Sequence, residues 1–351
     1  MLPTGSDGSR RREKGARAVP RTVNVAVVGA GGAAQVVHLP ILKRLQDLNV
    51  AGLVDSDLSK ARTIAQRFQV EAVAPTLDDL AETADFDAVL ICSPTSEHES
   101  GVLSALSHGA HVMCERPFVT RSAAARRLID AASEAGRELM IANNLRYRFD
   151  LRAIKHFVAN GEAGAVQHIR SNWLNRRSRR PRRGWRRDPS RAGGGALMDL
   201  GAQALDVLLW ILDYPVVERL CARSRGEGEV ETSAVVHLAL AGGTSASVEV
   251  TWELIDEKDR HTVVVLGTRG SAFSYPLQLL TETESGVMDV TPPIDRPPSE
   301  LYTDSYRQEW GDFLRHVRGE KALASQEDQV RLLEVLEACY LSAREGREVA
   351  L

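Results

Sequence analysis

The segment Val25-Ala-Val-Val-Gly-Ala-Gly-Gly-Ala-Ala34 begins as an apolar run and continues as a glycine-rich turn. The apolar run predicts a buried parallel strand, because a strand covered on both faces carries no polar side. Gly29, Gly31 and Ala34 then follow the spacing G-x-G-x-x-A, and a helical pattern continues to about residue 48. Strand, turn and helix in this order predict the first unit of a doubly wound α/β domain.

A second predicted strand, over residues 50–55, ends in Asp55, at the spacing of about 20 residues that a dinucleotide-binding unit requires. Gly29 permits the tight turn, and Gly31 lets the backbone approach a pyrophosphate. The start of the helix presents unpaired N–H groups to phosphates, and Asp55 can accept hydrogen bonds from a ribose diol. These features predict nucleotide binding, and a glycine-rich turn that binds nothing is the alternative interpretation. Asp55 favours NAD over NADP, because its charge repels a 2′-phosphate.

The composition is typical of a globular protein with more than one domain. The chain has 351 residues, of which 43% are hydrophobic, and this is too long for one ordinary core. No apolar run approaches the ~18 residues of a membrane span, so we expect no membrane partner. Residues 1–21 predict a disordered basic tail, since no apolar segment of a secretory signal follows the arginines. Four cysteines without metal-ligand spacing predict a reducing, cytoplasmic location with neither a disulfide nor a metal.

Positive charge is concentrated in one segment, although the formal net charge of the chain is −3. Residues 176–191 contain nine arginines and a single acid, Asp188. Three interpretations are open: a solvated loop, a nucleic-acid surface, or a wall of a site for an anionic substrate. Nucleic acid is disfavoured because the rest of the chain is acidic and only Trp173 and Trp185 could stack on bases.

The pattern of predicted elements divides the chain into two domains. Strands and helices alternate as far as Asn143, so residues 22–143 predict a Rossmann domain with a doubly wound parallel sheet. Residues 144–351 predict an α+β domain with a large, mostly antiparallel sheet, because several strands follow one another without helices. Two helices, at about 304–318 and 326–344, end the chain. The predicted helices cannot cover both faces of such a sheet, which favours a homodimer or a homotetramer.

Several short motifs follow one another in the order of a known family. They are Gly29-Ala-Gly-Gly, His38-Leu-Pro, Ser93-Pro-Thr-Ser-Glu-His98, Cys114-Glu-Arg-Pro-Phe118, Gly193-Gly-Gly-Ala-Leu-Met-Asp-Leu-Gly-Ala-Gln-Ala-Leu-Asp206 and Ala338-Cys-Tyr-Leu-Ser-Ala-Arg-Glu-Gly-Arg-Glu-Val349. In these motifs the chain resembles the Gfo/Idh/MocA oxidoreductases, relatives of glucose-fructose oxidoreductase and inositol dehydrogenase, over about residues 22–351.

The resemblance implies positions for the cofactor and for catalysis. Cofactor-binding positions implied by the turn and the motifs are Gly29, Gly31, Gly32, Ala33, Asp55, Ser93, Pro94, His98, Glu115, Arg116 and Asn144. The lysine that the family places beside the nicotinamide is Arg116 here. The family's catalytic Asp and His fall on Asp199 and Gln203, so the histidine is missing.

These departures change the expected proton chemistry. Glutamine has no titratable proton, and arginine stays protonated, so Arg116 can stabilise an alkoxide but is a poor base. Asp199 and Gln203 share one helix face, and the proton acceptor left is Asp199, a tyrosine such as Tyr147, water or a coupled group of the substrate. The leading hypothesis is an NAD-dependent oxidoreductase acting on a sugar, cyclitol or similar polyol. The alternatives are a cofactor-binding protein that has lost redox turnover, and non-redox or multi-step chemistry with a tightly held cofactor.

Overall fold

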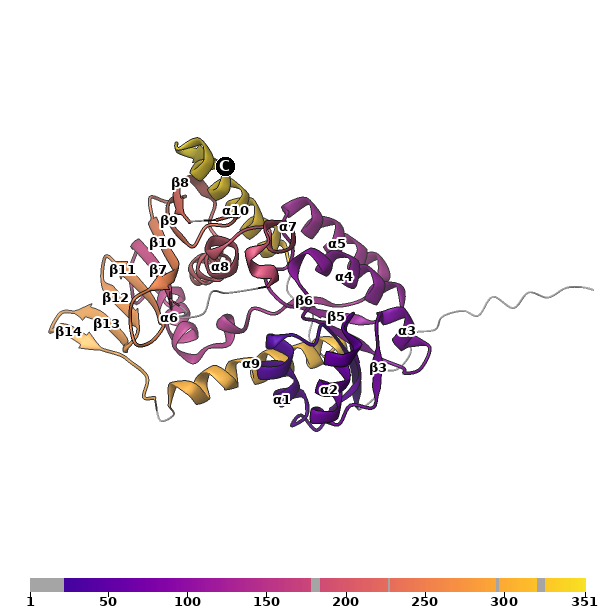
Figure 1. The fold of residues 1–351 in the computed structure, drawn as a ribbon. Helices are drawn as coiled ribbons and strands as arrows, with labels where there is room; N and C mark the ends of the chain where they lie inside the picture. Colours follow the sequence, from indigo (N-terminus) through magenta and orange to yellow (C-terminus); the bar gives the residue numbers. More distant parts are fainter. Residues whose placement is uncertain (1–21, 178–183, 227, 295–296, 321–325) are drawn as a thin grey trace, which may run out of the picture.

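The computed structural model describes residues 22–177, 184–226, 228–294, 297–320 and 326–351 (Figure 1). The predicted basic tail, residues 1–21, and the centre of the arginine-rich segment lie outside the described residues. The described residues form two sheets, one of six strands and one of nine. The two sheets match the predicted fold class, α/β with a second, mostly antiparallel sheet.

The six-stranded sheet is parallel and has the order β3-β2-β1-β4-β5-β6. Its strands are β1 (Val23–Val28), β2 (Leu48–Val54), β3 (Ala72–Ala74), β4 (Ala88–Ile91), β5 (His111–Cys114) and β6 (Leu139–Ile141). The connecting helices are α2 (Leu58–Phe68), α3 (Leu77–Ala81), α4 (His98–Ser107) and α5 (Ser122–Ala135). Every residue of β4 is buried, as expected for a central strand covered on both faces.

The helix after the glycine turn is shorter than the sequence pattern predicts. It begins as a π-helical turn, η1 (Ala34–His38), continues as α1 (Leu39–Leu42), and ends well before residue 48. Pro40 has no N–H to donate to the preceding turn, and a wider turn before a proline avoids the lost hydrogen bond. The wide turn lies directly behind the glycine-rich segment.

The nine-stranded sheet has the order β14-β13-β12-β11-β7-β10-β9-β8-β15. Its strands are β7 (Val166–Arg176), β8 (Val217–Arg225), β9 (Ser233–Leu240), β10 (Ser245–Leu254), β11 (Arg260–Gly267), β12 (Gly270–Ser274), β13 (Leu277–Thr283), β14 (Gly286–Asp289) and β15 (Val349–Ala350). All neighbours are antiparallel except β7 and β10, which are parallel. The pattern did not predict β13, β14 or β15, because the edge strands β14 and β15 are short and β13, next to the edge, buries little of its side chains.

Helices of the second half cover the inner face of this sheet and reach back to the first domain. They are η3 (Asn144–Tyr147), α6 (Phe149–Ala159), α7 (Pro189–Ala192), η5 (Leu197–Gly201), α8 (Ala202–Ile211), α9 (Pro298–Val317) and α10 (Glu327–Glu345). The continuous helical stretch Pro189–Ile211 is long and apolar enough to cross a membrane, but 89% of its apolar window is buried inside the protein. It is therefore a core helix of the fold.

Helix α9 packs into the core of the parallel-sheet domain. It begins at Pro298, earlier than the pattern predicts, and runs from below α6 into the first domain beside α1 (Figure 1). Trp310 and Phe313 of α9 are fully buried and belong to the same apolar cluster as Val25 of β1 and Leu39 of α1. A distant part of the sequence thus completes the core behind the glycine turn.

Candidate functional site

The glycine turn follows the end of β1 and packs against the backbone that follows β4. Gly29 has a φ of +94°, and a Cβ there would lie 2.6 Å from the backbone nitrogen of Ser93. No other residue fits that position. Gly32 has open space where a side chain would be, and Ala33 precedes the first helical turn. The turn therefore leaves its backbone accessible at the carboxyl edge of the sheet, where α/β domains bind ligands.

Asp55 follows β2 and accepts three hydrogen bonds. The donors are the backbone N–H of Ala30 at 2.9 Å, the backbone N–H of Asp57 at 2.9 Å, and the Lys60 ammonium at 2.7 Å. Burial raises the pKa of Asp55, but Lys60 and the two N–H groups outweigh burial, and the pKa lies below its ordinary value. Lys60 was not predicted as a site residue, although its position in the first turn of α2, soon after Asp55, could have indicated this contact.

The loop after β4 presents polar atoms without partners. The hydroxyl oxygens of Ser93 and Thr95 are buried and have no hydrogen-bond partner among the described residues. Pro94 lies between them. The ring of His98 is 1% exposed, and its nitrogens lie 2.8 Å from the Phe118 carbonyl and 2.9 Å from the Ser93 carbonyl. Burial holds the pKa of His98 below its ordinary value. His98 thus holds the loop backbone in place and presents no free nitrogen.

A buried cluster surrounds Glu115 at the end of β5. The indole nitrogen of Trp310 donates to Nδ1 of His38 at 3.1 Å, and Nε2 of His38 lies 2.8 Å from Glu115 Oε1. Because an indole can only donate, Nδ1 must be the acceptor and Nε2 carries the hydrogen that Glu115 accepts. Burial raises the pKa of Glu115, but Arg116 and His38 outweigh burial and bring it to about 2. Glu115 is therefore a carboxylate.

Arg116 connects this cluster to a cavity. Its Nη1 donates to Glu115 Oε2 at 3.0 Å, and its Nε is buried without a partner among the described residues. Burial lowers the pKa of Arg116, but Tyr306 and Glu115 outweigh burial and raise it, so the guanidinium stays charged. An unpartnered, charged N–H group beside a cavity can bind a substrate oxygen.

The triple glycine fixes the start of the helix that carries Asp199 and Gln203. A Cβ at Gly194 would lie 1.9 Å from the Tyr340 hydroxyl, and one at Gly195 would lie 1.9 Å from the Glu231 carbonyl oxygen. The Glu231 carboxylate accepts the backbone N–H groups of Gly195 at 2.8 Å and Leu197 at 3.0 Å. The glycines therefore serve close packing, and Glu231 satisfies the N–H groups at the helix start.

Asp199, Gln203 and Arg116 line one cavity of about 490 Å³. Asp199 Oδ2 accepts from the Trp252 indole at 3.2 Å, and Oδ1 lies 3.6 Å from Nε of Arg186. Gln203 Nε2 donates to the backbone carbonyl of Asp199 at 2.8 Å, and Oε1 is buried without a partner among the described residues. The three catalytic positions predicted from the sequence are thus brought together.

Other walls of this cavity were not predicted as site residues. The remaining lining residues are Trp173, Asn175, Trp185, Arg186 and Leu200. The Arg186 guanidinium lies over the ring of Trp185, 4.5 Å from its centroid. In the sequence, these residues could have been indicated by the arginine-rich segment, which contributes Arg186 to the cavity wall.

Two predicted residues lie away from the cavity. Tyr147 donates its hydroxyl to Asp312 Oδ2 at 2.8 Å, and it does not line the cavity beside Gln203. Tyr147 is therefore not placed to accept a proton there. Asn144 is fully buried, and its amide donates to Ser305 Oγ at 3.2 Å while Oδ1 has no partner among the described residues.

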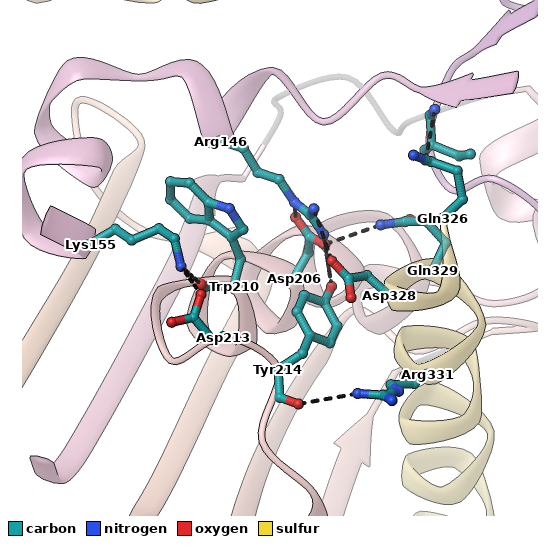
Figure 2. Close-up of polar contacts among 11 residues, drawn as sticks. Arg146, Lys155, Asp206, Trp210, Asp213, Tyr214, Gln326, Asp328, Gln329 and Arg331 are labelled. Atoms are coloured by element: carbon teal, nitrogen blue, oxygen red, sulfur yellow. Dashed lines mark hydrogen bonds and ion pairs between the residues drawn. The ribbon is translucent and has the colours of Figure 1, made fainter. Parts of the chain in front are cut away.

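A polar network holds η3 against α8 and α10 (Figure 2). Arg146 donates to both oxygens of Asp206, at 3.0 and 2.5 Å, and it lies 3.3 Å from Asp328. Tyr214 and Gln329 also donate to Asp206, at 2.5 and 3.3 Å. Asp206 lies on the helix that carries Gln203, so the network fixes the position of that helix relative to η3 and α10.

Two family models match the chain. The oxidoreductase family with an NAD-binding Rossmann fold matches residues 23–143, and the GFO/IDH/MocA C-terminal domain matches residues 151–273. The chain belongs to the Gfo/Idh/MocA family. The resemblance inferred from the motifs is confirmed, and the protein is an oxidoreductase with an NAD-binding domain.

Relatives match over nearly the whole chain. D-glucoside 3-dehydrogenase of Escherichia coli is 27% identical over 94% of this chain and 97% of its own length. Myo-inositol 2-dehydrogenase of Thermotoga maritima is 26% identical over 94% of this chain and 98% of its own length. The crystal structure of GenD2 from gentamicin A biosynthesis, in complex with NAD, has a TM-score of 0.82 at 27% identity and covers 100% of this chain and 99% of its own.

The residues around the glycine turn fit NAD. The turn leaves space at Gly32, and buried oxygens of Ser93, Thr95 and Asn144 remain without partners among the described residues. Asp55 is a carboxylate at the end of β2, where a ribose diol is bound in such domains. Within the described part of the chain, no group of three or more His, Cys, Asp or Glu side chains could hold a metal ion.

Proposed function

We propose that this protein is an NAD-dependent dehydrogenase of a sugar, a cyclitol or a similar polyol. The observation that carries the proposal is the single cavity lined by Arg116, Asp199 and Gln203, with an unpartnered donor on Arg116 and an unpartnered acceptor on Gln203. A polyol can satisfy both, because one hydroxyl can accept from Arg116 while a neighbouring hydroxyl donates to Gln203. The names of the glucoside and inositol dehydrogenase relatives support this substrate class.

Each of the three residues has a separate role in the proposed reaction. NAD, when bound, takes up the hydride of the carbinol carbon or returns it. Arg116 donates to the substrate oxygen and stabilises negative charge that develops there. Gln203 Oε1 accepts from a neighbouring hydroxyl and so orients the substrate, and the Asp199 carboxylate accepts the proton of the reacting hydroxyl as the carbonyl forms.

The charge of the cavity favours an anionic substrate. Two guanidinium groups, of Arg116 and Arg186, face one carboxylate, Asp199, and the rings of Trp173 and Trp185 supply flat apolar walls. Planar guanidinium groups suit carboxylates and phosphates, while indole faces suit the C–H face of a sugar ring. We therefore propose a sugar acid or a sugar phosphate as the substrate, and a solvated arginine loop remains the competing interpretation.

A screen of cofactor reduction tests the function. Wild-type protein with NAD is mixed with neutral sugars, inositols, sugar acids and sugar phosphates at pH 7 and pH 10, and absorbance of the reduced cofactor is followed. We expect turnover on at least one polyol, with anionic members ahead of their neutral counterparts. Turnover on none of them, although NAD binds, would favour the second candidate, a cofactor-binding protein without redox turnover. The non-titratable Gln203 is the observation that favours this second candidate.

NAD should bind at least tenfold more tightly than NADP. The support is the Asp55 carboxylate, which accepts from a ribose diol and repels a 2′-phosphate. Calorimetric titration with both cofactors measures the ratio directly, and equal dissociation constants would contradict the preference. Asp55→Ala should reduce the ratio of the NADP dissociation constant to that of NAD.

We further propose a cytoplasmic homodimer or homotetramer formed through the outer face of the nine-stranded sheet. Val235 and Leu266 project from that face and are 39% and 41% exposed. A second copy would cover these apolar side chains. Light scattering at micromolar concentration should give at least twice the mass of one chain, and a monomer would refute the proposal.

A further inference from the structure

Lys60 lies where the cofactor ribose would be recognised, since its partner Asp55 ends β2. Its ammonium is 2.7 Å from Asp55 Oδ2, and its side chain is 40% exposed. It belongs to the first turn of α2, where the helix dipole disfavours a cation and favours an anion. Pairing with Asp55 offsets that unfavourable position.

The Asp55 carboxylate cannot serve Lys60 and a ribose diol at the same time without rearrangement. An ionised carboxylate offers about four acceptor positions, and three are in use. Two of them bind backbone N–H groups of Ala30 and Asp57, which the fold holds in place. Two ribose hydroxyls need two positions, so the Lys60 ammonium must withdraw when they bind.

We infer that Lys60 sets the cofactor selectivity of this enzyme by moderating the preference for NAD. The inference rests on the proposed NAD-dependent function. After it leaves Asp55, the Lys60 ammonium is held by its own side chain near the ribose 2′-position, where NAD has a hydroxyl and NADP has a phosphate. There it competes with the diol for Asp55, and it can pair with a 2′-phosphate that Asp55 alone would repel. Asp55 and Lys60 therefore act in opposite directions on cofactor choice.

Calorimetric titration of NAD and NADP into wild type, Lys60→Ala, Lys60→Gln and Arg62→Ala tests the inference. Arg62 is the matched control, because it is an exposed cation on the same helix but on a different face. In Lys60→Ala the dissociation constant of NADP should rise about tenfold, while that of NAD stays constant or falls up to about threefold. Lys60→Gln, which keeps the length of the side chain, should show the same change in ratio, and Arg62→Ala should alter neither constant more than about twofold.

Three outcomes separate the inference from the function on which it rests. If the dissociation constant of NADP rises relative to that of NAD in both Lys60 variants, the inference holds. If both constants rise together, Lys60 only holds Asp55 in place and the inference is wrong. If wild type binds neither cofactor, the proposed function itself fails. Thermal unfolding of each variant without cofactor identifies any change that comes from lost folding.

Discussion

The nucleotide end and the substrate cavity differ in how the chain builds them. At the nucleotide end, Gly29 and Asp55 belong to one strand–helix–strand unit, and their positions follow from where β1 and β2 end. The cavity is assembled from separate segments: Arg116 after β5, Trp173 on β7, and Gln203 on α8. Local sequence therefore determines the first site, whereas the second exists only when the two sheets are in place.

The carboxylates at the nucleotide end are satisfied by protein donors, although Ser93 and Thr95 there keep buried hydroxyls without partners among the described residues, as groups in the cavity do. Asp55 has three protein donors, and Glu115 has His38 and Arg116. In the cavity, Arg116 Nε and Gln203 Oε1 are buried without partners among the described residues. Leaving such groups unsatisfied costs about 1–3 kcal/mol each, so a site that retains them is one that a ligand completes. Four variants, one of them a double substitution, test how these groups contribute.

Asp199→Asn should have the largest effect. It keeps the size of the side chain but removes the proposed proton acceptor, and a positioned general base contributes about 10²–10⁴ to the rate. We expect kcat to fall about 10³-fold on the best substrate of the screen, with the calorimetric dissociation constant of NAD unchanged. A tenfold or smaller loss would assign the proton to another group.

Asp206→Asn should weaken the network that holds the helix of Gln203. Arg146 would lose the nearer of its two carboxylate partners in a mostly buried site and keep only Asp328, which costs about 3 kcal/mol in the free energy of unfolding. Urea unfolding measures this loss. Tyr214→Phe, which removes uncharged hydrogen-bonding partners of the same carboxylate and of Arg146 but no charge, is the control and should cost about 1 kcal/mol. Equal effects of the two variants would contradict a charge-dependent contact.

The double variant Arg116→Lys with Gln203→His restores the residues usual in the family. If the native residues are adapted to the native substrate, as we expect, turnover on that substrate should fall by about one to two decades. On a simple polyol the new histidine should raise turnover, because its pKa suits proton transfer near neutral pH. Steady-state kinetics of both proteins on the same panel decide this. Arg116→Ala should also lose native turnover, and unchanged turnover would count against this adaptation.

Glu309→Gln should have the smallest effect, and it should depend on pH. Glu309 of α9 is fully buried, and neither carboxyl oxygen has a hydrogen-bond partner among the described residues. Burial, reinforced by Glu115, raises the pKa of Glu309 well above its ordinary value. An acid of this kind contributes stability below the unfolded pKa of about 4.3 and loses it as the pH rises toward the folded pKa.

Wild type should therefore become less stable than Glu309→Gln as the pH rises above about 4.3, by at least about 1 kcal/mol at pH 7. Chemical unfolding of both proteins at several pH values from 4 to 8 measures the difference. A difference that stays constant with pH would mean that Glu309 is ionised in the folded protein. Glu115→Gln is the contrast, since its depressed pKa gives stability that is lost only as the pH falls through about 2.

The sequence predicted most of the first domain and part of the cavity. The glycine spacing, Asp55 and the alternating strands are local signals, and they located the nucleotide end. Asp199 and Gln203 could be found because they share one helix motif, and Arg116 because it lies in another. Trp252, which donates to Asp199, comes from a strand far along the chain, and no local pattern marks it. Tyr147 was a wrong candidate because its orientation depends on Asp312 of α9.

Helix α9 has a consequence for how the protein is made. Trp310 and Phe313 complete the core behind β1 and α1, although more than 250 residues separate them from Val25. During synthesis the nucleotide domain emerges from the ribosome first, but its core cannot be completed until α9 has been synthesised. Until then the apolar surface that Trp310 later covers is exposed, and chaperones can bind it. A fragment ending at residue 143 should for the same reason aggregate or unfold readily, although it contains every strand of its sheet.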